Sequence, residues 1–307
     1  MPTRLIDIGE SQDRKHARLV ITRTSEIQAP YLALSYCWGA GVKLTTALRD
    51  DNLQELQSYI IEEELPKTHR DMFQLARDLG FRYIWIDALC IVQGNEEDWA
   101  YESKRMAQVY GNAALTIIAG RAADSRDGFL ENRCRPITGP CAIPFYDEDI
   151  SQKLALGETE MGNIWISLPR SVKFGPVSER GWCFQESLLS SRALVFGEEQ
   201  LRFHCQELEI QEGGGVGRPL PYRIRNPYDE SYASNPDSKP LGFQKLDDQE
   251  LARRWLIFWY REVLGLYTIR KLSNPTDVLA AISGMAQIAK ARIRSRYLAG
   301  LWEADSK

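Results

Sequence analysis

The segment YLALSYCWG, residues 31–39, begins with an apolar run and ends in a turn. Its apolar part predicts a buried strand, and its last three residues predict the turn that follows. Two more apolar runs of strand length come later, FRYIWID at 81–87 and AALTIIA at 113–119. The run at 81–87 is too apolar to have a face in water, which is typical of a strand buried inside a sheet.

Helical patterns separate these three strands. Thr68 is a candidate cap for a helix whose apolar residues recur at helical spacing up to Gly80. Asn95 is a candidate cap for a second helix, which ends at Gly111. Strands that alternate with helices through short connections predict an α/β fold, in which helices flank a parallel sheet.

The remaining chain predicts the domain organisation. We expect a domain over residues 1–210, with a long irregular insertion at about 120–178 and a small β-hairpin at about 193–203. The Gly-, Pro- and Ser-rich residues 211–245 predict a linker. Residues 246–307 show helical periodicity and predict a mainly helical C-terminal region.

Composition excludes several classes of protein. The 307 residues carry 38 Lys and Arg against 42 Asp and Glu, a net charge of −4, without the basic stripe of a nucleic-acid binder. No apolar run approaches the roughly 18 residues of a membrane span. The six cysteines form no CxxC pair, which favours a reducing, cytoplasmic setting without a metal site. We therefore expect a small-molecule or protein partner.

Polar residues follow the predicted strands at the edge where ligands bind in open parallel sheets. These strand ends carry Ser35, Tyr36, Trp38 and Gly39, then Asp87, then Gly120. Asp87 closes an apolar strand, so its carboxylate needs a polar partner or an opening to solvent. Two interpretations of Asp87 stay open, a site residue or a cap of the turn that follows.

Glu186 is the second acid of interest. It follows Trp182 by one turn of a helix predicted at Ser178–Ser187 and capped by Ser178, so ring and carboxylate share a face. An acid beside an aromatic ring suits ribose hydroxyls or a cationic transition state. The alternative is an exposed glutamate paired with Arg180 or Arg192.

Five segments resemble, in order and spacing, the fungal heterokaryon incompatibility (HET) domain. They are YLALSYCWG (31–39), LPKTHRD (65–71), LGFRYIWIDALCIVQ (79–93), EDWAYESKRMAQVYGNAALTIIA (97–119) and ERGWCFQESLLSSRALVF (179–196). The resemblance covers roughly residues 30–205. It implies a role in fungal non-self recognition, a form of innate immunity that ends in programmed cell death. Longer family members continue beyond this region, so we expect a truncated or naturally short form.

HET domains are regarded as distant relatives of Toll/interleukin-receptor (TIR) domains, which implies a TIR-like, flavodoxin-like sheet. Ser35-Tyr36-Cys37-Trp38-Gly39 is similar to the end of the first TIR strand, and Ile86-Asp87 to the end of the second. Trp182-Cys183-Phe184-Gln185-Glu186 resembles the TIR motif Trp-Cys-x-x-Glu, whose glutamate is catalytic in NAD-cleaving members. The long segment 120–178 departs from a compact TIR domain.

This resemblance implies an NAD hydrolase (NAD+ nucleosidase) that releases nicotinamide when self-associated, with NAD as substrate and no cofactor. Glu186 would be catalytic, and the substrate would bind to Ser35, Tyr36, Trp38, Gly39, Asp87, Arg180 and Trp182. Trp38 or Trp182 could stack on a ring, and Arg180 could meet a phosphate. The expected partners are further copies of the chain and an upstream non-self sensor. The alternative is a non-catalytic signalling scaffold, in which Glu186 is a structural or interface residue.

Overall fold

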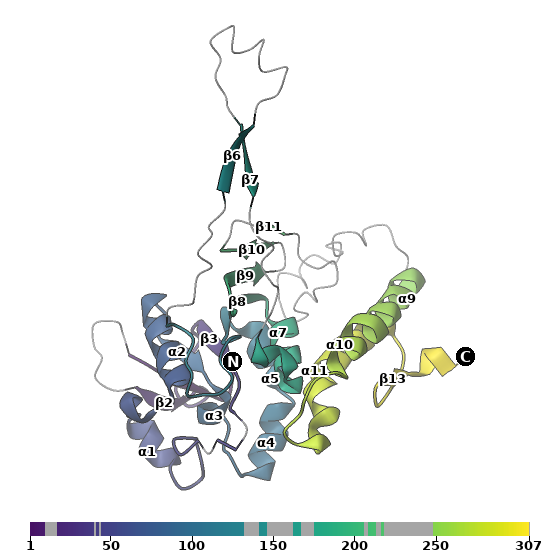
Figure 1. The fold of residues 1–307 in the computed structure, drawn as a ribbon. Helices are drawn as coiled ribbons and strands as arrows, with labels where there is room; N and C mark the ends of the chain where they lie inside the picture. The colour runs from purple at the N-terminus through teal and green to yellow at the C-terminus, as the bar shows by residue number, and fades with distance from the viewer. Residues whose placement is uncertain are drawn as a thin grey trace.

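A central nine-stranded sheet organises the molecule, in the order β11-β10-β9-β8-β5-β3-β4-β1-β2 (Figure 1). The computed structural model describes residues 1–9, 17–39, 41–42, 44–131, 141–145, 162–166, 175–205, 208–212, 216–217 and 248–306. The strands of this sheet are β1 (Arg4–Asp7), β2 (Arg18–Ile21), β3 (Tyr31–Ser35), β4 (Tyr83–Trp85), β5 (Leu115–Ile118), β8 (Arg192–Phe196), β9 (Leu201–Cys205), β10 (Glu209–Gln211) and β11 (Val216–Gly217).

The middle of the sheet is parallel. Strand β3 pairs in parallel with both β4 and β5, and β5 pairs in parallel with β8. Counted along the chain, these four strands stand in the order 2-1-3-4. The α/β prediction with a parallel core is therefore confirmed, although antiparallel strands make the whole sheet mixed. The predicted hairpin is also confirmed, because β8 and β9 pair as antiparallel neighbours.

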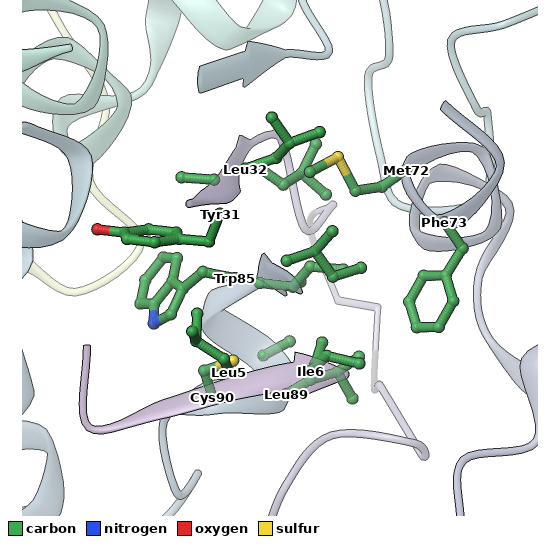
Figure 2. Packing of buried hydrophobic residues seen from close by; sticks show 14 of the residues in the cluster. Leu5, Ile6, Tyr31, Leu32, Met72, Phe73, Trp85, Leu89 and Cys90 are labelled. Carbon is green, nitrogen blue, oxygen red and sulfur yellow. The ribbon is translucent and has the colours of Figure 1, made fainter. Parts of the chain in front are cut away.

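Helices cover both faces of the parallel core. Tyr31 points to one face, where its hydroxyl donates to the carbonyl of Val109 in α5 (Met106–Asn112). Met72 and Phe73 belong to α2 (Lys67–Asp78), which lies on the other face (Figure 2). Every residue of β3 is consequently buried, which explains the unbroken apolar run that predicted this strand.

The remaining helices also have defined bounds. They are α1 (Leu53–Ser58), α3 (Asp87–Cys90), α4 (Glu96–Ser103), α7 (Gly181–Leu189), α9 (Asp248–Phe258), α10 (Gly265–Tyr267) and α11 (Ala280–Ile293). The cap at Asn95 is confirmed, since its side chain accepts hydrogen bonds from two backbone amides of α4. The helix predicted from Asn95 to Gly111 is in fact two helices, because the chain turns between α4 and α5.

The predicted cap at Thr68 is wrong. Helix α2 begins at Lys67, so Pro66 takes the cap position and Thr68 is the second residue of the helix. Thr68 is fully buried, and its hydroxyl accepts the amide of Gly128 at 3.2 Å. Asp71 likewise accepts the amide of Phe129 at 2.6 Å. Both side chains therefore hold the segment after β5 against α2, and neither of them caps the helix.

The helical prediction for the C-terminal region is confirmed. A π-helical segment (Trp259–Leu264) joins α9 to α10, and α11 follows. A second buried apolar cluster connects this region to α7 through Phe184 and Leu189, which pack with Trp259 and Met285.

The insertion and the linker are described only in part. In the insertion, β6 (Cys141–Phe145) and β7 (Gly162–Ile166) form an antiparallel pair, so it is not wholly irregular as predicted. Most of the predicted linker, 211–245, lies outside the described residues. The division into domains stays a prediction.

Candidate functional site

A cavity of about 550 Å³ lies beside α7, at the carboxyl ends of β3 and β4. We call this cavity the α7 cleft. Six of the residues predicted for the site line it: Trp38, Gly39, Asp87, Arg180, Trp182 and Glu186. Ligands of open parallel sheets bind at the carboxyl ends of the strands, and the cleft lies at that edge of this sheet. Helix α7, which carries Glu186, also lines the cleft.

Asp87 is held at the start of α3, directly after β4. Its Oδ2 accepts the indole N–H of Trp38 at 2.8 Å, and its Oδ1 accepts the amide of Ala88 at 2.7 Å. Burial raises the pKa of Asp87, and the positive charge of Arg180 opposes this effect. Asp87 lines the cleft, but it does not cap α3, whose N-cap position is Ile86 and which has no side-chain cap.

Glu186 is a buried acid, with 4% of its surface exposed. Burial raises the pKa of its carboxyl to about 7, and the Asp87 carboxylate acts in the same direction. The Ser35 hydroxyl and the charge of Arg180 act in the opposite direction. Near neutral pH this carboxyl can therefore either hold a proton or carry a charge, which is the property of an acid tuned for chemistry. The interpretation of Glu186 as an exposed surface residue is wrong.

Arg180 enters the cleft from the residue before α7. Its guanidinium donates a hydrogen bond to the carbonyl of Tyr36, in the turn after β3. The predicted cap at Ser178 is wrong, because a 3-10 turn at Pro176–Glu179 precedes α7 and Arg180 takes the cap position. The positive charge of Arg180 therefore acts on the carboxyls of both Asp87 and Glu186.

Ser35 and Tyr36 do not line the cleft. Both are buried behind it, with 1% and 2% of their surfaces exposed. The Tyr36 carbonyl accepts from Arg180 and, at 3.7 Å, from the Cys183 thiol. The Ser35 hydroxyl influences the pKa of Glu186, although it makes no hydrogen bond of ordinary geometry within the described residues. These two residues therefore support the cleft from inside the sheet. Gly120, the third strand end, also lies outside the described lining.

The C-terminal region supplies one wall of the cleft, which the sequence analysis missed. Lys271, Asn274 and Asp277 line the cleft together with residues of the turn after β3. The indole N–H of Trp182 donates to Asp277 Oδ2 at 3.0 Å, and the amide of Gly181 donates to the Lys271 carbonyl at 2.8 Å. The only local signal was Asn274-Pro275, which predicts a turn but not its position.

The cleft combines the carboxyls of Asp87, Glu186 and Asp277, the cations Arg180 and Lys271, and indole rings. This set suits an organic ligand with hydroxyl groups and a planar ring. Trp99 adds a further ring, edge-on to Trp182 with the centroids 6.3 Å apart. Among the residues that the structure describes, no three His, Cys, Asp or Glu side chains are grouped to hold a metal ion. In the same part of the chain, no helix is both long and apolar enough to cross a bilayer.

Comparison with known proteins addresses the family resemblance. The family model described as heterokaryon incompatibility protein (HET) matches residues 31–186. This match covers slightly more than half of the chain, from the first residue of β3 to Glu186 in the cleft. No curated protein and no solved structure matches the chain. The family match confirms the resemblance seen in the five segments, and the chain belongs to the heterokaryon incompatibility (HET) family.

Proposed function

We propose that this protein acts in heterokaryon incompatibility by cleaving the N-glycosidic bond of NAD in the α7 cleft. Membership of the HET family indicates the incompatibility role. The observation that carries the enzymatic proposal is the buried carboxyl of Glu186, whose pKa burial raises to about 7 and which faces a cavity of about 550 Å³. Cavities of roughly 300–1,000 Å³ are typical of small-molecule sites.

In this reaction, the bond between the ribose C1′ and the nicotinamide nitrogen breaks, and its electron pair leaves with nicotinamide. Positive charge then develops on the ribose, as in glycoside hydrolysis. The Glu186 carboxylate would stabilise that charge, because its low-dielectric position strengthens the attraction. Water adds to C1′ and loses a proton, so the products are nicotinamide, ADP-ribose and a proton.

The other residues of the cleft would orient the substrate. Trp38 and Trp182 offer indole surfaces for the nicotinamide or adenine ring, and Gly39 lines the cleft beside them. Arg180 supplies positive charge for a phosphate, and Asp87 would fix Trp38 through their hydrogen bond. Ser35 and Tyr36 would act from behind the cleft, through Glu186 and Arg180.

A TIR-like, flavodoxin-like fold is part of the proposal. The parallel strand order 2-1-3-4 supports it, because flavodoxin-like sheets begin with this order and bind ligands where the order reverses. The reversal falls between β3 and β5, and the turn after β3 carries Trp38 and Gly39 into the cleft. Self-association and an upstream non-self sensor are the proposed means of switching the activity on.

Incubation of the purified protein with NAD tests the proposal by measuring nicotinamide release over a series of protein concentrations. We expect turnover that increases more than in proportion to protein concentration and that falls by about 100-fold in Glu186→Gln. Glu198→Gln, in the exposed turn between β8 and β9, is the matched control and should leave the rate unchanged. Absence of turnover at every concentration, or full turnover in Glu186→Gln, would exclude the enzymatic proposal.

A signalling scaffold is the second candidate function. The slight exposure of Glu186, 4%, favours it, because a buried acid can also serve only to organise its neighbours. Induced expression in fungal cells separates the two functions. If the protein is a scaffold, Glu186→Ala that folds normally remains lethal; if it is an NAD hydrolase, the same variant is harmless and cellular NAD stays at its normal level.

A further inference from the structure

We propose that a second cavity, on the opposite side of α7 from the cleft, binds a short aliphatic carboxylate through Arg270. The two cavities use different faces of one helix. Trp182 and Glu186 face the α7 cleft, whereas Phe184 and Leu188 face the second cavity. Successive helical residues are rotated by about 100°, which puts these two pairs on roughly opposite sides of the helix axis.

The walls of the second cavity favour a hydrocarbon ligand. Ile118 of β5, Val195 of β8, Val177 and Leu266 contribute aliphatic surface to a space of about 200 Å³. Pockets for drug-sized ligands measure roughly 300–1,000 Å³, so this smaller cavity suits a smaller molecule than the dinucleotide proposed for the cleft. Each further CH₂ group buried here would strengthen binding by about fourfold.

Arg270 gives the cavity its charge preference. Its guanidinium lies over the ring of Phe184, 4.6 Å from the centroid, and donates to the carbonyls of Leu266 at 3.2 Å and Arg180 at 3.3 Å. These partners are all uncharged. Within the described part of the chain, no carboxylate forms an ion pair with Arg270, and burial lowers its pKa.

Other arginines of the C-terminal region differ in this respect. Arg254 pairs with Glu250 at 3.0 Å and Arg294 with Asp248 at 2.8 Å, so each of these arginines has a carboxylate partner. Arg270 is partly buried, has no carboxylate partner among the described residues and lies beside a cavity. A partly desolvated cation without a counter-ion is costly, and an anion bound at its remaining N–H groups would remove that cost. The ligand class therefore combines one anionic head with a short apolar tail.

Isothermal titration of the full chain tests this assignment with straight-chain carboxylates from acetate to palmitate. We expect affinity to rise with chain length, to level off once the cavity is filled, and to be at least about tenfold weaker for hexan-1-ol than for hexanoate. Affinity that keeps rising up to palmitate would overturn the short-chain assignment. Absence of binding at millimolar hexanoate would overturn the site itself.

Three variants separate the roles of charge and space. Arg270→Gln should lose at least about tenfold in hexanoate affinity, whereas Arg261→Gln, an exposed arginine of the same region, should not. Ser187→Leu should weaken binding by filling the cavity while Arg270 stays in place. Unchanged binding in both Arg270→Gln and Ser187→Leu would contradict the proposal. Because neither variant alters the α7 cleft lining, NAD cleavage can fail independently of this test.

Discussion

Trp182 donates its indole N–H to Asp277 Oδ2 at 3.0 Å and so connects α7 to the turn before α11. Trp182 lies inside the region that the HET family model matches, and Asp277 lies outside it. Both residues line the α7 cleft. The cleft is therefore completed by the C-terminal region and is not a property of the family-matched residues alone.

Asp277→Ala should loosen this wall. The change leaves the Trp182 indole N–H without its acceptor, and because both groups are partly exposed we expect a loss of about 1 kcal/mol in the free energy of unfolding. Urea denaturation followed by tryptophan fluorescence measures the loss. Asp277→Asn keeps an acceptor oxygen of the same shape and should lose less; equal losses in both variants would contradict a role for this hydrogen bond.

Gly181→Ala should disturb the contact between α7 and Leu272 of the C-terminal region. A Cβ atom at Gly181 would lie 2.5 Å from Cδ2 of Leu272, which is too close for undisturbed packing. We expect a destabilisation of about 1–3 kcal/mol, measured by thermal or urea unfolding. Leu272→Ala removes the obstructing side chain, so the double variant should recover part of the loss caused by Gly181→Ala. If the loss of stability in the double variant equals the sum of the losses in the two single variants, the clash with Leu272 is not the cause of the destabilisation.

The raised pKa of Glu186 should make stability depend on pH. Its ordinary pKa is 4.5 and its folded value is about 7, so the folded state binds more protons between these values. Stability therefore falls as pH rises from 4.5 to about 7, by roughly 3 kcal/mol from this group, and is constant above. Glu186→Gln removes the penalty. We therefore expect the free energy of unfolding of Glu186→Gln, minus that of the parent protein, to be larger at about pH 8 than at about pH 5.

Urea denaturation of both proteins at the two pH values gives this difference directly. Asp87 also has a raised pKa, but it is present in both proteins and its contribution cancels to first order. An equal effect of Glu186→Gln at both pH values would mean that the Glu186 carboxyl titrates normally.

Trp38→Phe should act through Asp87. The substitution removes the N–H that Asp87 Oδ2 accepts at 2.8 Å and keeps most of the aromatic packing. An ionised carboxylate needs this donor more than a protonated carboxyl does, so the loss should be larger at high pH, about 1.5–3 kcal/mol at about pH 8. Urea denaturation at several pH values measures it. A loss independent of pH would show that only packing has changed.

The sheet and half of the cleft could be predicted because their signals are local. Strand β3 is buried on both faces, so its sequence is uniformly apolar, and the residue types at its end and at the end of β4 marked the cleft. Asn95 was identified as a cap because its hydrogen bonds reach only two and three residues along the chain.

The missed features depend on contacts distant in sequence. Asp277 lies 95 residues from Trp182, and nothing near either residue encodes the pairing. Thr68 has the residue type of a helix cap, but its hydroxyl serves Gly128, 60 residues away. Strand β1 was not predicted because it has only four residues and ends in Asp7, a buried acid that Arg82 holds at 2.8 Å.

The rate of nicotinamide release from NAD as a function of pH tests the central role of Glu186 most directly. If the ionised carboxyl stabilises the cationic transition state, the rate of the parent protein rises with pH to a plateau, with a midpoint near the Glu186 pKa of about 7. Glu186→Gln should show only a low rate without this rise, while Glu198→Gln follows the parent protein. A Glu186→Gln profile with the same rise and the same plateau, or no release by the parent protein at any pH, would contradict the account.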